Sequence, residues 1–206
     1  MIGIIDYNAG NIRSVEHALD SLGIQNIRSK DPRELAPCDR LIFPGDGDAA
    51  YAMGELKKTG FDSFLKDAAA MGKPVLGICV GSQIIFDHSE EGDVPCLGLA
   101  RGTIRHLSGL WKEAGVPPLK VPHMGWNDIE PTAGGGDNPL FRGLLFPLAV
   151  YFVHSYAIVP DDPAVVAAAA DYGVPVPAAV RSGTILALQF HPEKSGEPGL
   201  RMLRNF

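Results

Sequence analysis

Short apolar runs alternate with stretches of helical spacing through the first half of the chain. Apolar residues recur every three or four positions in residues 12–22 and 61–71, which predicts two amphipathic helices. Four apolar runs are predicted to be strands: residues 3–5, 24–27, 40–43 and 75–78. Strands that alternate with helices in this way are typical of a parallel sheet covered on both faces, the α/β class.

The second half of the chain is less regular. One or two strands are expected within residues 97–107, and residues 114–129 are rich in proline and glycine. A helix is expected at residues 197–205. Further short strands are expected at residues 150–153, 165–170, 178–181 and 185–190. No linker or repeat divides the sequence, so we expect residues 1–206 to form a single domain.

The composition favours a globular protein and argues against nucleic-acid binding and membrane association. The 206 residues are 46% hydrophobic and 20% charged, which is a globular balance, and the net charge of -6 argues against a nucleic-acid-binding surface. No apolar segment reaches about 18 residues, so we expect no membrane association. The chain has an odd number of cysteines and no Cys-x-x-Cys pair, which favours a reducing compartment and hence the cytoplasm. These cysteines are Cys38, Cys79 and Cys96.

One cysteine stands in a pattern that predicts a nucleophile. Gly77-x-Cys79-x-Gly81 follows the last apolar run of the first half, and residues 84–86 are expected to continue as a helix. A nucleophile between a strand and a helix sits on a sharp turn, where glycines let the two elements pass closely. The backbone N–H of Val80 would then stabilise an oxyanion, and a helix N-terminus would favour the thiolate. The alternative is a buried structural cysteine.

A cysteine nucleophile needs a base, and the base needs an orienting group. The predicted strand at 185–190 leads directly into His191-Pro192-Glu193. A carboxylate close to a catalytic histidine fixes its tautomer and stabilises the imidazolium. The order Cys79, His191, Glu193 therefore predicts a catalytic triad, although a solvated loop with an incidental acid has the same local sequence.

The loop at residues 44–48 follows the third predicted strand and contains Gly45 and Gly47. Glycines allow backbone to approach a ligand closely, so we expect this loop to supply the second oxyanion donor. No residues have the spacing of a zinc site, and no phosphate-binding glycine loop follows a strand. We therefore expect neither a metal nor a cofactor.

Taken together, these residues resemble a known enzyme family. Gln83, four residues after Cys79, and Phe190-His191-Pro192-Glu193 resemble the triad-type class-I glutamine amidotransferases. Within that family the chain is similar to the glutaminase subunits of imidazole glycerol phosphate synthase, an enzyme of histidine biosynthesis. Four stretches carry this narrower resemblance: residues 4–15, 122–127, 151–156 and 189–195.

The resemblance implies a fold, a substrate and an intermediate. The expected fold is flavodoxin-like, with a mixed, mainly parallel central sheet and helices on both faces. The expected substrate is glutamine, which would form a thioester on Cys79. Gln83 and the backbone around Ser155 and Tyr156 are expected to hold the glutamine.

The resemblance also implies a partner, the (βα)8-barrel cyclase subunit, which would receive the ammonia in a heterodimer. Four positions are expected to face it: Asn11, Met124, Trp126 and Lys194. Two positions depart from the family pattern, since Asp46 and Ser82 stand where an apolar residue is usual. We expect the Asp46 carboxylate to point outward, because a charge turned toward a developing oxyanion would repel it.

Three other functions are compatible with parts of this pattern. The chain could be a glutaminase subunit of another synthase, such as anthranilate or pyridoxal phosphate synthase, but the run at 122–127 argues against that. It could be a cysteine hydrolase of peptides or small amides, which Gln83 and residues 151–156 disfavour. It could also be a non-catalytic binding subunit, which is hard to reconcile with a complete triad.

Overall fold

The computed structural model describes residues 1–135 and 138–206 of the chain. Nine of the described strands form one large sheet: β1 (Ile2–Ile5), β2 (Asn26–Ser29), β3 (Arg40–Gly45), β4 (Val75–Cys79), β8 (His123–Pro131), β9 (Leu148–His154), β11 (Val166–Asp171), β12 (Pro175–Ser182) and β13 (Ile185–Leu188). Their order across the sheet is β2-β1-β3-β4-β13-β12-β11-β8-β9.

This sheet is parallel in one half and antiparallel in the other. β2, β1, β3, β4 and β13 pair in parallel, and β13, β12, β11, β8 and β9 pair antiparallel. The predicted mixed sheet with flanking helices is therefore confirmed. The antiparallel half is as large as the parallel half, because β11, β12 and β13 follow one another through short turns and β8 and β9 pair antiparallel beside them.

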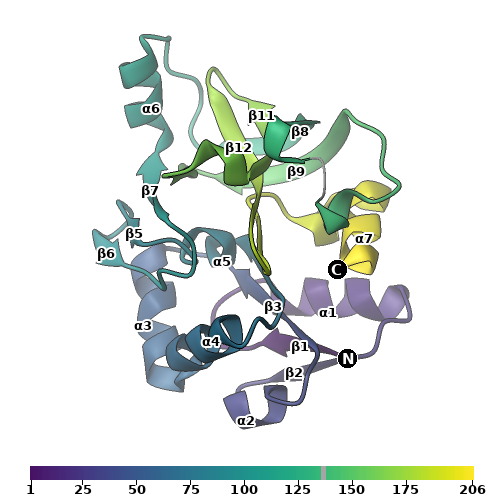
Figure 1. Ribbon diagram of the computed structural model, residues 1–206. Helices are drawn as coiled ribbons and strands as arrows, with labels where there is room; N and C mark the ends of the chain where they lie inside the picture. The colour runs from purple at the N-terminus through teal and green to yellow at the C-terminus, as the bar shows by residue number, and fades with distance from the viewer. Residues whose placement is uncertain (136–137) are drawn as a thin grey trace.

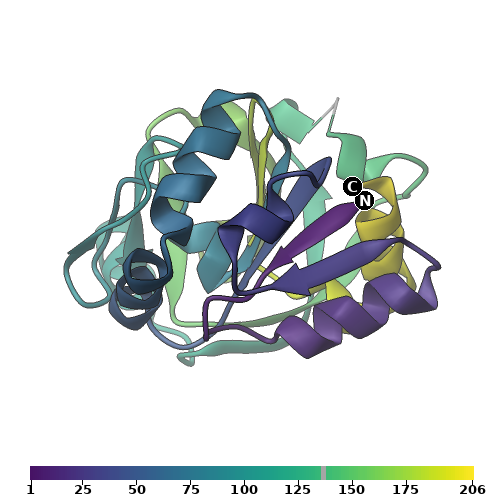
Figure 2. The ribbon, with the colours of Figure 1, turned by 90° about the horizontal axis from the view of Figure 1, so that it is seen from below.

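Helices cover both faces of the parallel half. Figures 1 and 2 show α1 (Ile12–Ser21) and α7 (Gly196–Asn205) together on one side, and α3 (Ala49–Thr59) and α4 (Phe61–Ala70) on the other. The apolar stripe that predicted α1 is the face that it buries: Ile12, Val15, Ala18 and Leu19. None of the described helices has the length and hydropathy needed to cross a membrane.

Shorter elements complete the described part of the chain. A second sheet runs in the order β10 (Tyr156–Pro160), β7 (Gly102–His106), β5 (His88–Ser89) and β6 (Val94–Pro95). Three further α-helices are α2 (Pro32–Leu35), α5 (Val80–Gln83) and α6 (Leu107–Ala114), and the 3-10 turns are η1 (Ala133–Gly135), η2 (Pro139–Phe141), η3 (Pro163–Val165) and η4 (Pro192–Lys194). Ser155 lies between β9 and β10 and so joins the two sheets.

The predicted helix through residues 84–86 is wrong. The α5 helix ends at Gln83 after a single turn, and the carbonyls of residues 84–86 accept hydrogen bonds from the amides of residues 97–99 instead. Several other elements were not predicted, α3 and β8 among them. The Asp48 side chain accepts a hydrogen bond from the Tyr51 amide and so begins α3, and pairing with β9 makes a strand of residues 123–131 despite their glycine and proline.

The closest backbone contact in the parallel half joins β3 to α5. A Cβ atom at Gly81 would lie 2.1 Å from the carbonyl oxygen of Phe43, and one at Gly45 would lie 2.2 Å from the Gly81 amide nitrogen. Real Cβ atoms do not approach backbone this closely, so both positions require glycine. This contact fixes the start of α5 against the end of β3.

Gly81→Ala is therefore expected to lower the free energy of unfolding by about 2–3 kcal/mol, because the added methyl group overlaps rigid backbone. Gly54→Ala is the matched control. Gly54 lies within α3 with no atom within 4 Å of its Cβ position, so that variant should gain about 0.4–1 kcal/mol. Urea titrations of both variants measure the difference, and equal stability of the two would contradict the packing account.

Candidate active site

The site lies at the carboxyl ends of three neighbouring parallel strands. Gly45 at the end of β3 pairs with Cys79 at the end of β4, and β13 on the other side of β4 leads into His191. Since the carboxyl ends of parallel strands meet at one edge of a sheet, residues distant in sequence come together there. The three predicted triad residues reach the same region by this route.

Cys79 has a strained backbone. Its φ of 55° and ψ of -116° are unusual for a residue with a side chain, and it is buried. The Ser82 hydroxyl donates a hydrogen bond to the Cys79 carbonyl over 2.6 Å, which holds the turn. The Cys79 sulfur lies 3.8 Å from the Val153 carbonyl oxygen. The α5 helix has one turn only, so its dipole stabilises a thiolate little. The sequence had predicted a longer helix, which would have stabilised the thiolate more.

His191 and Glu193 form a buried pair. The His191 Nδ1 lies 2.8 Å from Glu193 Oε1, and the side chains are 5% and 1% exposed. The backbone around the histidine is fixed, since its amide donates to Tyr151 and its carbonyl accepts from the Ser195 hydroxyl. His191 Nε2 makes no hydrogen bond to any described residue, which leaves it available to a reacting group.

The charge on His191 is favoured by its neighbours. Burial lowers the pKa of His191, but the electrostatic interactions with Cys79 and Glu193 outweigh it and raise this pKa to about 10. At neutral pH the imidazole of His191 is therefore able to keep its proton. A protonated His191 next to Cys79 can donate its proton to a leaving group.

A cavity of about 620 Å³ opens over this region. Its wall includes most of the residues predicted to bind glutamine or the partner: Asn11, Gly47, Cys79, Val80, Gln83, Ser155, Tyr156, His191 and Lys194. Gly45 is buried beneath it, and Glu193 stands behind His191. Six further residues that had not been predicted to bind line the same wall: Ser14, Asp46, Glu91, Pro122, Val153 and His154.

Gln83 presents a defined acceptor to the cavity. Its Nε2 lies 2.9 Å from both the Tyr156 carbonyl oxygen and the Gln189 Oε1, so both of its N–H groups are used. The remaining polar atom, Oε1, is an acceptor. Gln83 is therefore suited to receive a donor from a ligand in the cavity.

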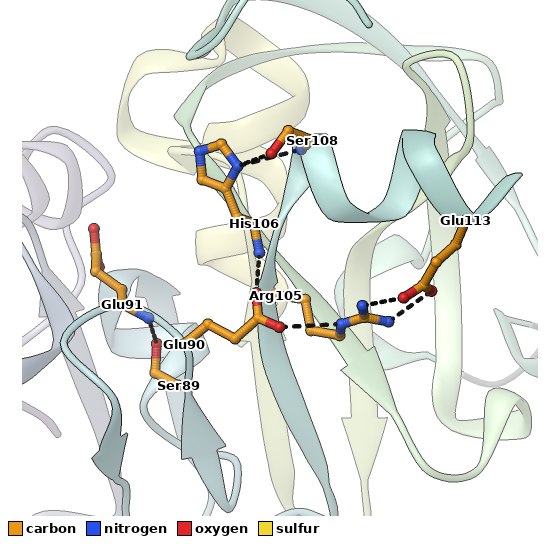
Figure 3. A network of polar contacts seen from close by, with 7 residues as sticks. All are labelled: Ser89, Glu90, Glu91, Arg105, His106, Ser108 and Glu113. Atoms are coloured by element: carbon orange, nitrogen blue, oxygen red, sulfur yellow. Dashed lines mark hydrogen bonds and ion pairs between the residues drawn. The ribbon is translucent and has the colours of Figure 1, made fainter. Parts of the chain in front are cut away.

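Glu91 adds a carboxylate to the cavity wall. It accepts a hydrogen bond from the Ala49 amide over 3.0 Å, and burial raises its pKa. Figure 3 shows that the adjacent Glu90 accepts from the His106 amide and pairs with Arg105, which in turn pairs with Glu113. This network holds the segment that carries Glu91. No local pattern singled Glu91 out, because residues 87–93 read as an acidic surface segment.

Asp46 is tied to the turn before α1. Its Oδ1 accepts a hydrogen bond from the Gly10 amide over 2.8 Å, and the residue is exposed. The neighbouring Tyr7 is fully buried, and burial together with the charges of Asp46 and Cys79 raises the pKa of its hydroxyl. The carboxylate of Asp46 therefore points to the Gly10 turn and is held by a backbone donor.

The four residues expected to face a partner divide into two pairs. Met124 and Trp126 are 60% and 59% exposed on β8, while Asn11 and Lys194 line the cavity. The Trp126 ring lies 6.2 Å from the Tyr151 ring and passes 3.9 Å from the Cβ position of Gly196, two residues after Lys194. Trp126 is thus close to the turn that carries Lys194.

Comparisons with known proteins identify the family of the chain. The family model "Glutamine amidotransferase class-I" matches residues 3–206. The chain is 46% identical over its whole length to "Imidazole glycerol phosphate synthase subunit HisH" of Nitratidesulfovibrio vulgaris, covering 95% of that protein. Identity to the subunit of the same name from Geobacillus kaustophilus is also 46%, with coverage of 100% of this chain and 95% of that one.

A solved structure supports the fold independently. The crystal structure of a glutamine amidotransferase superposes with a TM-score of 0.75 at 21% identity, covering 99% of this chain and 97% of the other. At that identity the likeness concerns the fold alone. With the full-length family match and the relatives at 46% identity, the chain belongs to the class-I glutamine amidotransferases, among the HisH subunits of imidazole glycerol phosphate synthase.

Proposed function

We propose that Cys79, His191 and Glu193 are the catalytic triad with which this glutamine amidotransferase hydrolyses glutamine. The observation that carries the proposal is the buried His191–Glu193 pair, 2.8 Å apart, whose unbonded Nε2 stands beside a cysteine on a strained strand-to-helix turn. In that arrangement His191 takes the thiol proton, and Glu193 stabilises the resulting imidazolium.

The thiolate of Cys79 then attacks the side-chain amide carbon of glutamine. The oxyanion that develops is held by the Val80 N–H and by a donor from the loop with Gly45 and Gly47. His191 returns its proton to the leaving nitrogen, so that ammonia departs and a thioester remains. Water activated by His191 hydrolyses the thioester to glutamate.

The rest of the cavity suits the two charged groups of a free amino acid. Glu91 is placed to pair with the α-ammonium group, with Gln83 Oε1 as a second acceptor. The backbone around Ser155 and Tyr156 is positioned to donate to the α-carboxylate. A peptide side chain has neither charged group, so this pocket favours free glutamine over a peptide amide.

The ammonia is destined for a partner. The relatives at 46% identity are named as subunits of imidazole glycerol phosphate synthase, and we propose the (βα)8-barrel cyclase subunit of that enzyme as partner. Asn11, Met124, Trp126 and Lys194 would face it. Ammonia would attack the ribulosyl formimino intermediate, giving imidazole glycerol phosphate and aminoimidazole carboxamide ribotide in histidine biosynthesis. We propose the cytoplasm as the site of this reaction, since all three cysteines are free.

Cys79→Ala should abolish glutamine-dependent product formation by the complex while leaving the reaction with added ammonia intact, because the cyclase reaction needs ammonia and not the thiolate. Cys96→Ala, which alters a partly buried cysteine outside the cavity wall, is the control and should keep both activities. Both reactions are followed by product absorbance. Residual glutamine hydrolysis in Cys79→Ala would show that another residue is the nucleophile.

Glu193→Gln should lower glutamine turnover by about a hundredfold or more and shift the pH profile. The carboxylate helps to raise the pKa of His191 to about 10, so its loss lowers that pKa. His191 must be protonated to release ammonia, and the alkaline limb of kcat/KM should therefore move to lower pH by about one unit or more. Glu197→Gln, at an exposed position in α7, should leave the limb unchanged. An unmoved limb in Glu193→Gln would exclude its proposed role.

Glu91→Gln should raise KM for glutamine about tenfold or more with a smaller change in kcat, because a charged hydrogen bond to the α-ammonium is lost. The side-chain oxygen of the new glutamine at position 91 can still accept the hydrogen bond from the Ala49 amide, so the cavity wall keeps its shape. Glu130→Gln on the exposed face of β8 is the control. Steady-state kinetics of the complex measure both, and an unchanged KM would place the ammonium elsewhere.

A further inference from the structure

Two buried histidines beside the cavity have no part in the proposed chemistry. His123 on β8 and His154 on β9 face each other directly across the antiparallel pair and are 3% and 5% exposed. His123 Nδ1 lies 3.0 Å from His154 Nε2. A buried pair of titratable rings in hydrogen-bond contact needs a defined proton arrangement.

Asn127 fixes the direction of this hydrogen bond. Its Nδ2 lies 3.0 Å from the Asp171 carbonyl oxygen and 3.2 Å from His123 Nε2, while its Oδ1 accepts from the Asp128 amide. The reverse amide orientation would oppose two oxygen atoms, so Nδ2 is the donor to His123. His123 Nε2 is then the acceptor, and the proton of the neutral ring is on Nδ1.

The proton position on His123 determines the proton position on His154. His123 Nδ1–H donates to His154 Nε2, so the proton of a neutral His154 is also on Nδ1. That nitrogen lies 2.8 Å from the Tyr156 carbonyl oxygen and donates to it. The Tyr156 carbonyl also receives the Gln83 Nε2. Every ring nitrogen from Asn127 to the cavity wall is thus satisfied in one arrangement.

The surroundings keep both rings neutral and in place. Burial lowers the pKa of His123 to about 4 and that of His154 to about 3, although the hydrogen bond to Tyr156 opposes the second shift. His123 is stacked between the rings of Phe152 and Tyr172, with centroids 4.5 Å and 4.0 Å away. Because the rings are uncharged and held in place, they can pass on a displacement through their hydrogen bonds but not a change of charge.

This chain of hydrogen bonds begins on the strand that carries the exposed Met124 and Trp126. Side chains alternate along β8, so His123 and Asn127 lie on its inner face and the two exposed residues on its outer face. A displacement of β8 at its outer face would therefore reach the Tyr156 carbonyl through the two rings. The cavity wall formed by His154, Ser155 and Tyr156 is at the other end.

We propose that Asn127, His123 and His154 form a neutral hydrogen-bond relay that positions the Tyr156 carbonyl, and with it Gln83, for glutamine binding. The histidines are positioning residues, since neither is assigned a contact with the reacting atoms. The relay rests on the proposed glutaminase function for its role, but its proton arrangement does not. It connects the outer face of β8 to the substrate pocket.

Substitutions at His123 test the role in the complex with the cyclase subunit. His123→Phe keeps the stacked ring but removes the donor to His154, and KM for glutamine should rise about tenfold while kcat changes less than about threefold. His123→Asn places an amide Nδ2 where Nδ1 was and should stay within about threefold of the unaltered chain. His17→Phe is the control, because His17 is exposed on α1 and takes no part in the relay.

The result that overturns the proposal is an unchanged KM in His123→Phe, or an equal rise in the Phe and Asn variants, which would assign the effect to packing. A substrate-free measurement covers the case in which variants fold poorly. In 15N-histidine NMR spectra of the unaltered full chain, both His123 and His154 should be protonated at Nδ1 only, without titration above pH 5. Protonation of His154 at Nε2 would refute the relay. If the unaltered complex does not hydrolyse glutamine, the proposed function fails, and the NMR result still decides whether the relay exists.

Discussion

The contact of bare backbone between β3 and α5 is the constraint on which the site depends. Because Gly45 and Gly81 lack side chains, the loop after β3 and the turn at Cys79 are pressed together at distances that no Cβ atom would allow. The nucleophile and the proposed oxyanion donors are therefore fixed relative to each other by the packing of backbone against backbone. The left-handed backbone at Cys79 is held in this frame by the Ser82 hydroxyl on the Cys79 carbonyl.

Around that contact lie two pairs of buried polar residues. The His191–Glu193 pair favours a protonated histidine ring, and the His123–His154 pair keeps both rings neutral. His191 has an ionisable partner on each side, which favours its protonated form. His123 and His154 have neutral partners, and burial leaves both rings uncharged. In the first pair His191 Nε2 makes no hydrogen bond to a described residue, whereas both rings of the second pair are fully hydrogen-bonded. Histidine thus has a proposed catalytic role at position 191 and a structural role at positions 123 and 154.

Local signals in the sequence were sufficient for the elements whose own residues determine them. The apolar stripe of α1, the strand before Cys79 and the short path from β13 to His191 and Glu193 were all readable in this way. Features that depend on distant partners were not. Residues 84–86 lose a helix to hydrogen bonds with residues 97–99, and β8 exists because β9 pairs with it. Glu91 reaches the cavity only through the second sheet, so no spacing in the sequence could indicate it.

The hydrogen bond between Gly10 and Asp46 has a consequence for how this chain can evolve. Its donor is the backbone amide of Gly10, whose φ of 106° and whose Cβ position, 2.9 Å from the Pro44 carbonyl oxygen, disfavour any other residue, so position 10 has little freedom to change. Its acceptor is a single side chain, and a one-base change converts an aspartate codon to one for valine, an apolar residue of the kind expected here from the family resemblance. The link between the two loops is therefore a trait that a lineage gains or loses in one mutational step, at an exposed position where the rest of the fold is undisturbed.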